Sequence, residues 1–534
     1  MLTSSLVYVI AIVNYFKLNL RQEPLYFSDI FSVREGMTVA GQYKVEITNK
    51  MWLIFFVTIV ITIILAKLPQ LLELRKRERL VGMLVALALF LGPVVQGYAT
   101  TAMQQYTKTP DSNAFDRMYT YSSRGVIYSF IRSYSEFVGI KPDNYSQKLV
   151  DGLMEEYTDV SLENNQINVL AIMMESYADL SKFQDFSESD VDPYYYFHQL
   201  QEDSYSGELL VDVFAGGTIQ TERASMTGYS VQGNFVKNTE SFAWYFARQG
   251  YTVEVHHPGL NWFYGRDKVN PRLGFETFYN EEYEVEQNED IGYFWGYMYF
   301  MRDKDFLPAV MDRFEESIES GNPTFNFAVT LQGHGPYSSE VKTDVAYLPE
   351  TDLLSDNEYN NVNNYLAEVA QTDQALQNLR ERIDASDEPI VLALYGDHLP
   401  ALGIGNTVGW YEKIGVNMDV TTVDGVLNMY STPYLFYAND AAKAILSVDN
   451  ETEGETISPL NMFPELFDYL NIEGSWFMNY LIDLKEELPV QNVYLYSYLG
   501  KWYQRNEELP EELSKLVDEY NAMSYYGQYK YSPK

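Results

Sequence analysis

The chain has 534 residues, of which 46% are hydrophobic, so it has room for two or three domains and for some membrane-embedded sequence. Its 75 acidic and 37 basic residues give a formal net charge of −38, which argues against a nucleic-acid partner. It contains no cysteine, which excludes disulfides, thiolate metal sites and a cysteine nucleophile.

Apolar runs in residues 1–100 predict membrane-spanning helices. Residues 51–67 and 80–98 are each long enough to cross a hydrocarbon core of about 30 Å. Residues 2–16 are apolar but shorter, and we expect them to be the end of a partial span; a signal-like or re-entrant segment is the alternative. The basic run 75–79 marks the loop between the two longer spans as cytoplasmic. We therefore expect a multi-pass protein of the cell membrane whose remaining residues are extracellular.

The pattern of the remaining residues predicts an α/β fold. Residues 101–165 have helix-compatible spacing and predict a helical connector, and beyond them strand-like runs alternate with helical patterns. This alternation predicts a mostly parallel central sheet flanked by helices. The clearest helix spans residues 361–384. The predicted strands are 167–174, 251–255, 324–331, 390–395 and 433–437.

Three of the predicted strands lead into acidic or imidazole side chains. Glu175 follows the first run, His334 follows the third, and Asp397 and His398 follow the fourth. Ligands bind at the carboxyl edge of open parallel sheets. The pattern therefore predicts one shared metal or phosphate site.

A fourth segment supplies hydroxyl groups. Gly216 and Gly217 are followed by Thr218 and Thr221 at the start of a predicted helix, where backbone N–H groups favour an anion. Alone, this pattern is an ordinary helix cap. A threonine hydroxyl becomes an effective nucleophile when it coordinates a divalent cation, because coordination lowers its pKa. Carboxylate and imidazole side chains are available in this sequence to hold such a cation.

These motifs together resemble the lipoteichoic acid synthase type of enzyme, within the alkaline phosphatase and sulfatase superfamily. The motifs are Met174-Glu175-Ser176, Gly217-Thr218 with Thr221-Glu222, and Tyr395-Gly396-Asp397-His398. The resemblance covers essentially the whole chain, and it implies that the family's first spanning helices are missing here. It implies that Glu175, Thr218, Asp397 and His398 bind one divalent ion, most often manganese, with magnesium as the alternative. It also implies that Thr218 becomes a covalent phosphoglycerol carrier.

The resemblance also suggests substrate contacts. His334 matches the family's histidine that faces the bound phosphoglycerol, where it can act as an acid or hydrogen-bond donor. His257 and Arg266 match the family's pair near the phosphate, and Tyr264 stands near the position of a family tryptophan. Two positions depart from the family pattern, because Gly217 replaces a lysine and Leu402 replaces a polar contact.

The expected function is transfer of glycerol phosphate from phosphatidylglycerol to a glycolipid or polymer acceptor, as in Gram-positive cell-wall biogenesis. The alternatives are a phosphoethanolamine or other phospho-head-group transferase, a phosphodiesterase, and a module that binds polymer without turnover. A sulfatase activity is disfavoured, because the candidate nucleophile is a threonine without the motif for formylglycine. The expected regions are 1–100 in the membrane, 101–165 as connector, 166–487 as catalytic domain and 488–534 as a C-terminal extension packed on it.

Overall fold

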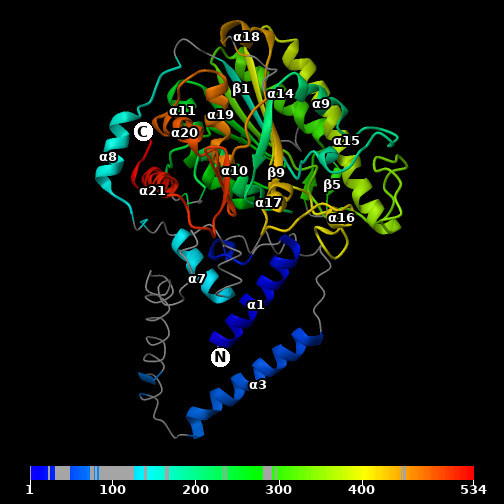
Figure 1. The fold of residues 1–534 in the computed structure, drawn as a ribbon, viewed down its shortest axis with the longest axis vertical. Helices are drawn as coiled ribbons and strands as arrows, with labels where there is room; N and C mark the ends of the chain where they lie inside the picture. The colour runs from blue at the N-terminus through cyan, green and yellow to red at the C-terminus, as the bar shows by residue number, and fades with distance from the viewer. Residues whose placement is uncertain are drawn as a thin grey trace. The chain divides into compact units, whose positions relative to one another are not determined.

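The computed structural model divides the chain into two compact units, Met1–Ile140 and Lys141–Lys534. The described residues are 2–21, 24–30, 49–71, 77, 81–82, 125–137, 141–142, 144–162, 167–230, 233, 235, 237–261, 263–280, 292–294, 298–446, 448 and 453–533. Figure 1 shows the elements with their labels.

The first unit consists of helices. They are α1 (Leu2–Arg21), the 3-10 helix η1 (Phe27–Ile30), α3 (Asn49–Leu71) and α7 (Val126–Phe137). The turn after α1 is held by side chains, since Asn14 Oδ1 accepts from Leu25 N at 2.8 Å and Lys17 Nζ lies 3.0 Å from Asp29 Oδ2. Ser133 Oγ, on α7, accepts a hydrogen bond of 2.7 Å from Phe27 N.

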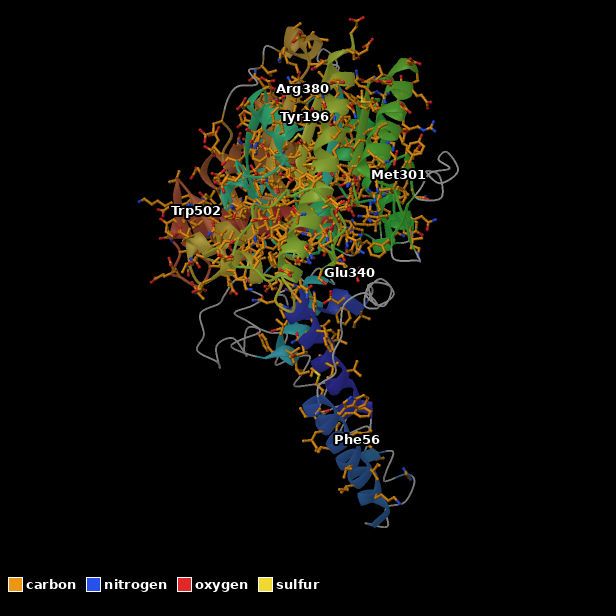
Figure 2. All side chains as sticks on the ribbon, turned by 90° about the vertical axis from the view of Figure 1, so that its right-hand side faces the viewer. Phe56, Tyr196, Met301, Glu340, Arg380 and Trp502 are labelled. Atoms are coloured by element: carbon orange, nitrogen blue, oxygen red, sulfur yellow. The ribbon has the colours of Figure 1, made fainter. Side chains whose placement is uncertain are left out.

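The predicted membrane segments are described in part. Helix α1 includes residues 2–16 and α3 includes residues 51–67, whereas 80–98 lie outside the described residues apart from 81–82. Within the described ranges, no helix has both the length and the apolar character that a membrane crossing requires. Several large apolar side chains of α3 are exposed, among them Leu53 and Phe56 (Figure 2). The multi-pass arrangement therefore stays a prediction.

The second unit is built on a seven-stranded sheet with the order β2-β9-β8-β1-β7-β3-β4. Strands β8, β1, β7, β3 and β4 are mutually parallel, and β9 runs antiparallel to both of its neighbours. The predicted mostly parallel sheet is thus confirmed. The strands are β1 (Asn168–Met174), β2 (Tyr205–Leu210), β3 (Thr252–His256), β4 (Thr277–Tyr279), β7 (Thr324–Val329), β8 (Ile390–Gly396) and β9 (Ser431–Ala438).

The central strands are apolar because both faces of the sheet are covered. Every residue of β1, β7 and β8 is buried, as expected for parallel strands between two helical layers. Figure 1 shows α11, α19 and α20 on one side of the sheet and α9, α14 and α15 on the other. Arg380 of α15 donates to Asp203 Oδ2 beside α9 at 2.5 Å, and Figure 2 shows Arg380 beside Tyr196 of α9.

The described helices of this unit fill the connections between strands and the C-terminal region. They are α8 (Gln147–Glu156), α9 (Tyr195–Glu202), α10 (Thr218–Thr227), α11 (Phe242–Arg248), α12 (Arg266–Val269), α14 (Asp303–Glu319), α15 (Asp356–Asp384), α16 (Gly409–Lys413), α17 (Val423–Tyr430), α18 (Asp440–Leu446), α19 (Met462–Tyr469), α20 (Trp476–Glu487) and α21 (Glu511–Tyr525). Two small antiparallel sheets complete the unit, β5 (Gly292–Phe294) with β6 (Met298–Phe300), and β10 (Val490–Gln491) with β11 (Leu495–Tyr498) and β12 (Lys501–Gln504).

Two features differ from the sequence-based expectation. Strands β2 and β4 are not among the predicted strands, because the half-buried positions of β2 and the three-residue length of β4 give a weak signal. Helix α15 begins at Asp356, five residues before the predicted start at 361. Its first turn is capped by the Glu358 carboxylate, which accepts from Ser355 N at 3.0 Å, and it lacks the apolar spacing that marks the later turns.

The ends of the catalytic region also have defined contacts. Of the predicted connector, α7 falls in the first unit and α8 in the second, while residues 101–124 lie outside the described residues. In the predicted C-terminal extension, Tyr520 of α21 donates to Gly228 O at 3.0 Å and accepts from Ser230 N at 2.7 Å. Helix α21 is therefore fastened to the segment that follows α10.

Candidate active site

The candidate site forms where three neighbouring strands end at the same level. In the sheet, Met174 pairs with Gly396 of β8, and Met173 pairs with Val329 of β7. The pairing continues past the strands, because Asp397 N donates to Met174 O at 3.1 Å. Glu175 and Asp397 therefore emerge side by side at the carboxyl edge, as the sequence pattern predicts.

Glu175, Asp397 and His398 form one buried cluster. A ligand atom from each of the three lies within 4.8 Å of the others. His398 Nε2 is 3.5 Å from Glu175 Oε1 and 3.3 Å from Asp397 Oδ2. Such spacing is compatible with three ligands around one small ion.

Thr218 is brought to this cluster by the start of α10. Gly217 caps the helix in the left-handed conformation with φ of 97°, which favours glycine, and Thr218 is the first helical residue. Thr218 Oγ1 donates to Glu175 Oε2 at 2.9 Å, and the residue is only 5% exposed. Thr221, one turn on, donates through Oγ1 to the backbone oxygen of Asp397 at 2.8 Å. Helix α10 is thus bonded directly to the segment that carries Asp397 and His398.

The electrostatics of the cluster fit a bound cation. Burial raises the pKa of Asp397 well above its ordinary value, and the nearby charge of Glu175 raises it further. Within the described part of the chain, Asp397 Oδ2 is buried and has no hydrogen-bond partner. Two carboxylates, an imidazole and a hydroxyl form a donor set suited to manganese or magnesium. These residues therefore fit a single divalent ion.

Two glycines permit the close approach of the segments around the site. A Cβ atom on Gly333 would lie 2.1 Å from Glu175 O, and one on Gly396 would lie 1.9 Å from Tyr177 O. Both distances are far shorter than any non-bonded contact, so only glycine fits at these positions. His334 follows Gly333 and therefore begins its loop directly against the backbone of Glu175.

Ser176 and Thr330 support the cluster, and neither was assigned a role from the sequence. Ser176 has a positive φ of 51°, its N–H donates to Asp397 Oδ1 at 2.7 Å, and its hydroxyl donates to Glu175 Oε1 at 3.0 Å. Thr330 Oγ1 accepts from Glu175 N at 3.0 Å. Only their positions directly after strands β1 and β7 hint at this support.

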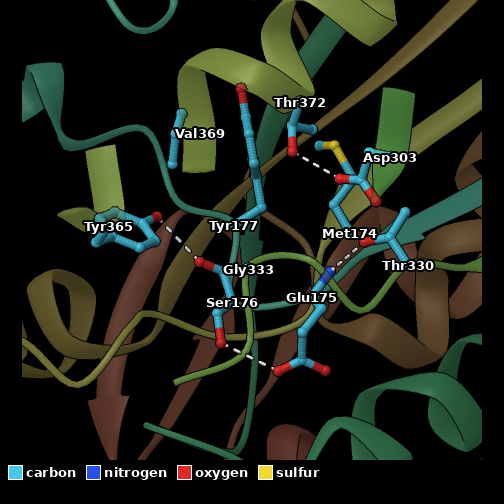
Figure 3. A pocket seen from close by; sticks show the side chains of 10 residues that line it. All are labelled: Met174, Glu175, Ser176, Tyr177, Asp303, Thr330, Gly333, Tyr365, Val369 and Thr372. Atoms are coloured by element: carbon cyan, nitrogen blue, oxygen red, sulfur yellow. Dashed lines mark hydrogen bonds between the residues drawn. The ribbon is translucent and has the colours of Figure 1, made fainter. Parts of the chain in front are cut away.

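A small cavity lies behind Glu175 (Figure 3). Its volume is about 10 Å³, which is room for about one water molecule. Asp303 and Thr330 line it, and Thr372 Oγ1 donates to Asp303 Oδ2 at 2.6 Å. Burial raises the pKa of Asp303 to about 7. The cavity is too small for a substrate.

The predicted substrate residues lie on segments that leave the same edge. His257 directly follows β3, and its Nδ1 lies 3.1 Å from Val329 O of β7. Burial lowers the pKa of His257 well below its ordinary value, and the charges of Arg266 and His334 lower it further. His334 Nδ1 lies 2.5 Å from Gly335 O.

Arg266 is already paired within the protein. Its Nη2 donates to Glu222 Oε2 at 2.5 Å, and the two side chains are 2% and 7% exposed. Its Nη1 is buried and makes no hydrogen bond within the described residues. Sequence reasoning predicted a substrate contact for Arg266 and gave Glu222 no role, although the position of Glu222 one turn after Thr218 offered a signal.

Tyr264 takes a left-handed conformation with φ of 55°. Its backbone oxygen accepts from Arg223 Nη2 at 2.7 Å, and its ring lies 5.4 Å from the Arg266 guanidinium. Leu402, a predicted departure from the family pattern, is completely buried. The roles of His257, Tyr264, Arg266 and His334 toward a substrate stay predictions.

Comparison with known proteins decides the family. The sulfatase family model matches residues 167–472, more than half of the 534 residues. The chain belongs to the sulfatase family. The predicted relationship to sulfatases is thereby confirmed, and the protein is a sulfatase-family enzyme.

A solved structure similar to this sulfatase-family protein is the phosphoglycerol transferase GacH of Streptococcus pyogenes in complex with sn-glycerol-1-phosphate. The TM-score is 0.54 at 18% identity, over 73% of this chain and 95% of that chain. At this identity the likeness shows the shared fold.

Two curated relatives come from Rhizobium meliloti. The "Putative cyclic beta-1,2-glucan modification protein" is 25% identical over 349 residues, which cover 61% of this chain and 49% of the relative. The "Capsular polysaccharide biosynthesis protein RkpI" is 24% identical over 404 residues, covering 71% of this chain and 69% of the relative. The sulfatase-family chain thus spans about half the length of the first of these relatives.

Proposed function

We propose that the protein is a membrane-anchored, metal-dependent phosphoglycerol transferase. It moves glycerol phosphate from phosphatidylglycerol, through a covalent phosphothreonine at Thr218, to a polymer or glycolipid acceptor. The observation that carries the proposal is the 2.9 Å hydrogen bond from Thr218 Oγ1 to Glu175 Oε2, beside the buried ligand atoms of Asp397 and His398.

Four side chains would hold the cation: Glu175, Thr218, Asp397 and His398. A bound manganese or magnesium ion would lower the pKa of the Thr218 hydroxyl and neutralise charge on the phosphate oxygens. The buried Asp397 oxygen without a hydrogen-bond partner among the described residues supports this assignment.

In the first step, Thr218 Oγ1 attacks phosphorus as its proton passes to Glu175 Oε2, the oxygen to which it already donates at 2.9 Å, and this proton returns to Thr218 in the second step. The bond from Oγ1 to phosphorus forms, the bond from phosphorus to the diacylglycerol oxygen breaks, and diacylglycerol leaves with a proton from His334. In the second step, an acceptor hydroxyl attacks the same phosphorus and gives its proton to His334. The acceptor oxygen then holds the phosphoglycerol, and Thr218 is restored.

Arg266 and His257 would bind the phosphate. The buried Nη1 of Arg266 offers a donor to a phosphate oxygen while Glu222 holds the other end of the guanidinium. Burial keeps His257 neutral, so it would contact the substrate as a hydrogen-bond donor or acceptor without adding charge. Tyr264 would line the phosphate-binding side of the proposed substrate site.

The location and the acceptor are part of the proposal. The apolar runs at 51–67 and 80–98, the basic cluster between them and the exposed apolar side chains of α3 support a membrane anchor with an extracellular catalytic domain. The names of the curated relatives concern glucan modification and capsular polysaccharide biosynthesis, which supports a saccharide polymer as acceptor.

The identity of the donor head group distinguishes the proposed function from a second candidate function. Leu402 is completely buried where the family has a polar contact, and Gly217 lacks the family's lysine. These two differences favour an altered head-group pocket, as in a phosphoethanolamine transferase. Both functions use the same nucleophile and metal.

Intact-mass analysis tests the proposal. The full-length protein in detergent, with Mn²⁺, is incubated separately with phosphatidylglycerol and with phosphatidylethanolamine. We expect a phosphoglycerol adduct on the wild type and on Thr227→Ala, which alters the far end of α10, and no adduct on Thr218→Ala. A phosphoethanolamine adduct would replace the proposed donor, and an adduct on Thr218→Ala would remove the proposed nucleophile.

A further inference from the structure

The start of helix α15 carries a group of asparagines that bind two loops of the active-site rim. Asn360, Asn361, Asn363 and Asn364 all donate from Nδ2 to backbone oxygens between residues 337 and 345. This stretch belongs to the loop that follows His334. The asparagine side chains therefore hold the backbone of residues 337–345 in place, although this segment has no regular secondary structure.

Asn361 differs from the others because it reaches a second loop. Its Nδ2 donates to Tyr337 O at 2.8 Å, and its Oδ1 accepts from Gly403 N at 3.1 Å. Tyr337 lies three residues after His334, and Gly403 lies five residues after His398. One side chain thus joins the loop of the predicted proton donor to the loop of a metal ligand.

Further contacts make this junction rigid. The Tyr337 hydroxyl donates back to Gly333 O at 2.6 Å, which closes the turn that carries His334. The Tyr337 ring packs on Tyr365 with a centroid distance of 5.0 Å. Tyr365 lies one turn after Asn361 on α15 and donates to Ser176 O at 3.0 Å, as Figure 3 shows. The same face of α15 therefore contacts all three loops around the cluster.

We propose that Asn361 is a positioning residue that sets the location of His334 relative to Glu175, Asp397 and His398. This inference rests on the proposed transferase function and goes beyond it, because Asn361 touches no predicted ligand or substrate. The residue is 6% exposed, so water does not replace a lost contact readily. Loss of its donor would release the turn at Tyr337 while leaving the metal ligands in place.

Asn363 provides a matched control. It is 5% exposed, its Nδ2 donates to Val345 O at 2.9 Å, and its Oδ1 accepts from Tyr347 N and Leu348 N. It therefore makes the same kinds of contact with the same loop, but farther from His334. Replacement of either asparagine by aspartate keeps the acceptor and turns the donor into a second oxygen facing a carbonyl.

The test compares Asn361→Asp with Asn363→Asp in the full-length protein, with Mn²⁺ and phosphatidylglycerol micelles. For Asn361→Asp we expect kcat of diacylglycerol release to fall about tenfold or more, with KM changed less than about twofold, because the acid is misplaced and the binding groups are not. For Asn363→Asp we expect kcat within about twofold of the wild type. Equal losses in the two variants would overturn the proposal.

Backbone hydrogen exchange gives a second readout that does not require activity. We expect faster exchange at residues 335–340 in Asn361→Asp and at 345–348 in Asn363→Asp. If the wild type transfers no head group, the proposed function fails, and unchanged exchange at 335–340 in Asn361→Asp would separately overturn the positioning role. If Asn361→Asp does not fold, Asn361→Ser removes both contacts without adding charge, and the same criteria apply.

Discussion

The carboxylate of Glu222 and the guanidinium of Arg266 form a buried ion pair one helical turn below Thr218. Their closest atoms are 2.5 Å apart, and both side chains are almost inaccessible to water. The arginine that the sequence assigns to phosphate binding is therefore held by a carboxylate on the helix that carries Thr218, the proposed nucleophile. This arrangement fixes the guanidinium before any substrate arrives.

Removal of the charge on Glu222 should be strongly destabilising. Glu222→Gln leaves the Arg266 charge buried without a counter-charge, which typically costs about 3–5 kcal/mol. Urea unfolding measures the loss. The control Glu316→Gln breaks the exposed pair with Arg313, for which we expect about 1 kcal/mol or less. Similar losses for the two variants would show that the Glu222 pair is not the anchor described.

Metal binding at the cluster of Glu175, Asp397 and His398 should stabilise the wild type, and no other site should contribute. Addition of Mn²⁺ at about one hundred times its Kd corresponds to about 2.7 kcal/mol, and we expect a rise in Tm that chelation reverses. Asp397→Asn should lose this rise. Glu254→Gln alters a buried carboxylate that accepts from Tyr279 and Ser317 and should retain it. An undiminished rise in Asp397→Asn would place the ion elsewhere.

Gly396 should tolerate no side chain. Its substitution by alanine places Cβ 1.9 Å from Tyr177 O, so strand β8 or the segment after Glu175 must shift. We expect Gly396→Ala to lower Tm and to abolish the Mn²⁺-dependent rise. A Cβ atom on Gly152 of α8 would have no described atom within 4 Å, so Gly152→Ala should raise stability by about 0.5–1 kcal/mol. A stable, metal-responsive Gly396→Ala would contradict the close approach.

The buried carboxyl of Asp303 should make stability fall as pH rises. Burial raises its pKa from 3.8 to about 7, so the folded protein binds this proton more tightly than the unfolded chain. The contribution of this proton to the free energy of unfolding is complete below about pH 4 and is lost as the pH rises through about 7. Asp303→Asn retains an acceptor for Thr372 and should raise Tm at pH 8 more than at pH 5. A Tm difference from the wild type that does not vary with pH would exclude this titration.

The sheet and the central cluster could be predicted because their signals are local. Five apolar runs correspond to β1, β3, β7, β8 and β9, and the residues after β1 and β8 are the acids and imidazole that the structure brings together. Buried parallel strands need continuous apolar sequence, and their carboxyl ends share one edge. The existence of these strands and the positions of their carboxyl ends therefore follow from a short local pattern.

The remaining features depend on tertiary partners. Nothing in the residues around Arg266 indicates that Glu222 is its counter-ion, since the two are 44 positions apart. The early start of α15 is equally hidden, because in its first five residues Asn360 donates to the Ser339 carbonyl instead of contributing to an apolar stripe. Helix propensity and periodicity do not report such side-chain-to-backbone contacts.

Strands β1 and β8 end at the same level of the sheet. Because of this arrangement, the spacing of the proposed metal ligands and the predicted substrate contacts can change independently in evolution. Three of the four proposed metal ligands, Glu175, Asp397 and His398, directly follow the buried strands β1 and β8, so the pairing of these strands sets their spacing, whereas Thr218 begins helix α10. The predicted substrate contacts lie instead on the segments after β3 and β7, with His257 and His334 in loops, Tyr264 in a 3-10 helix and Arg266 at the start of α12. Substitutions on those segments would accordingly alter the proposed substrate contacts while the three strand-end side chains keep their spacing.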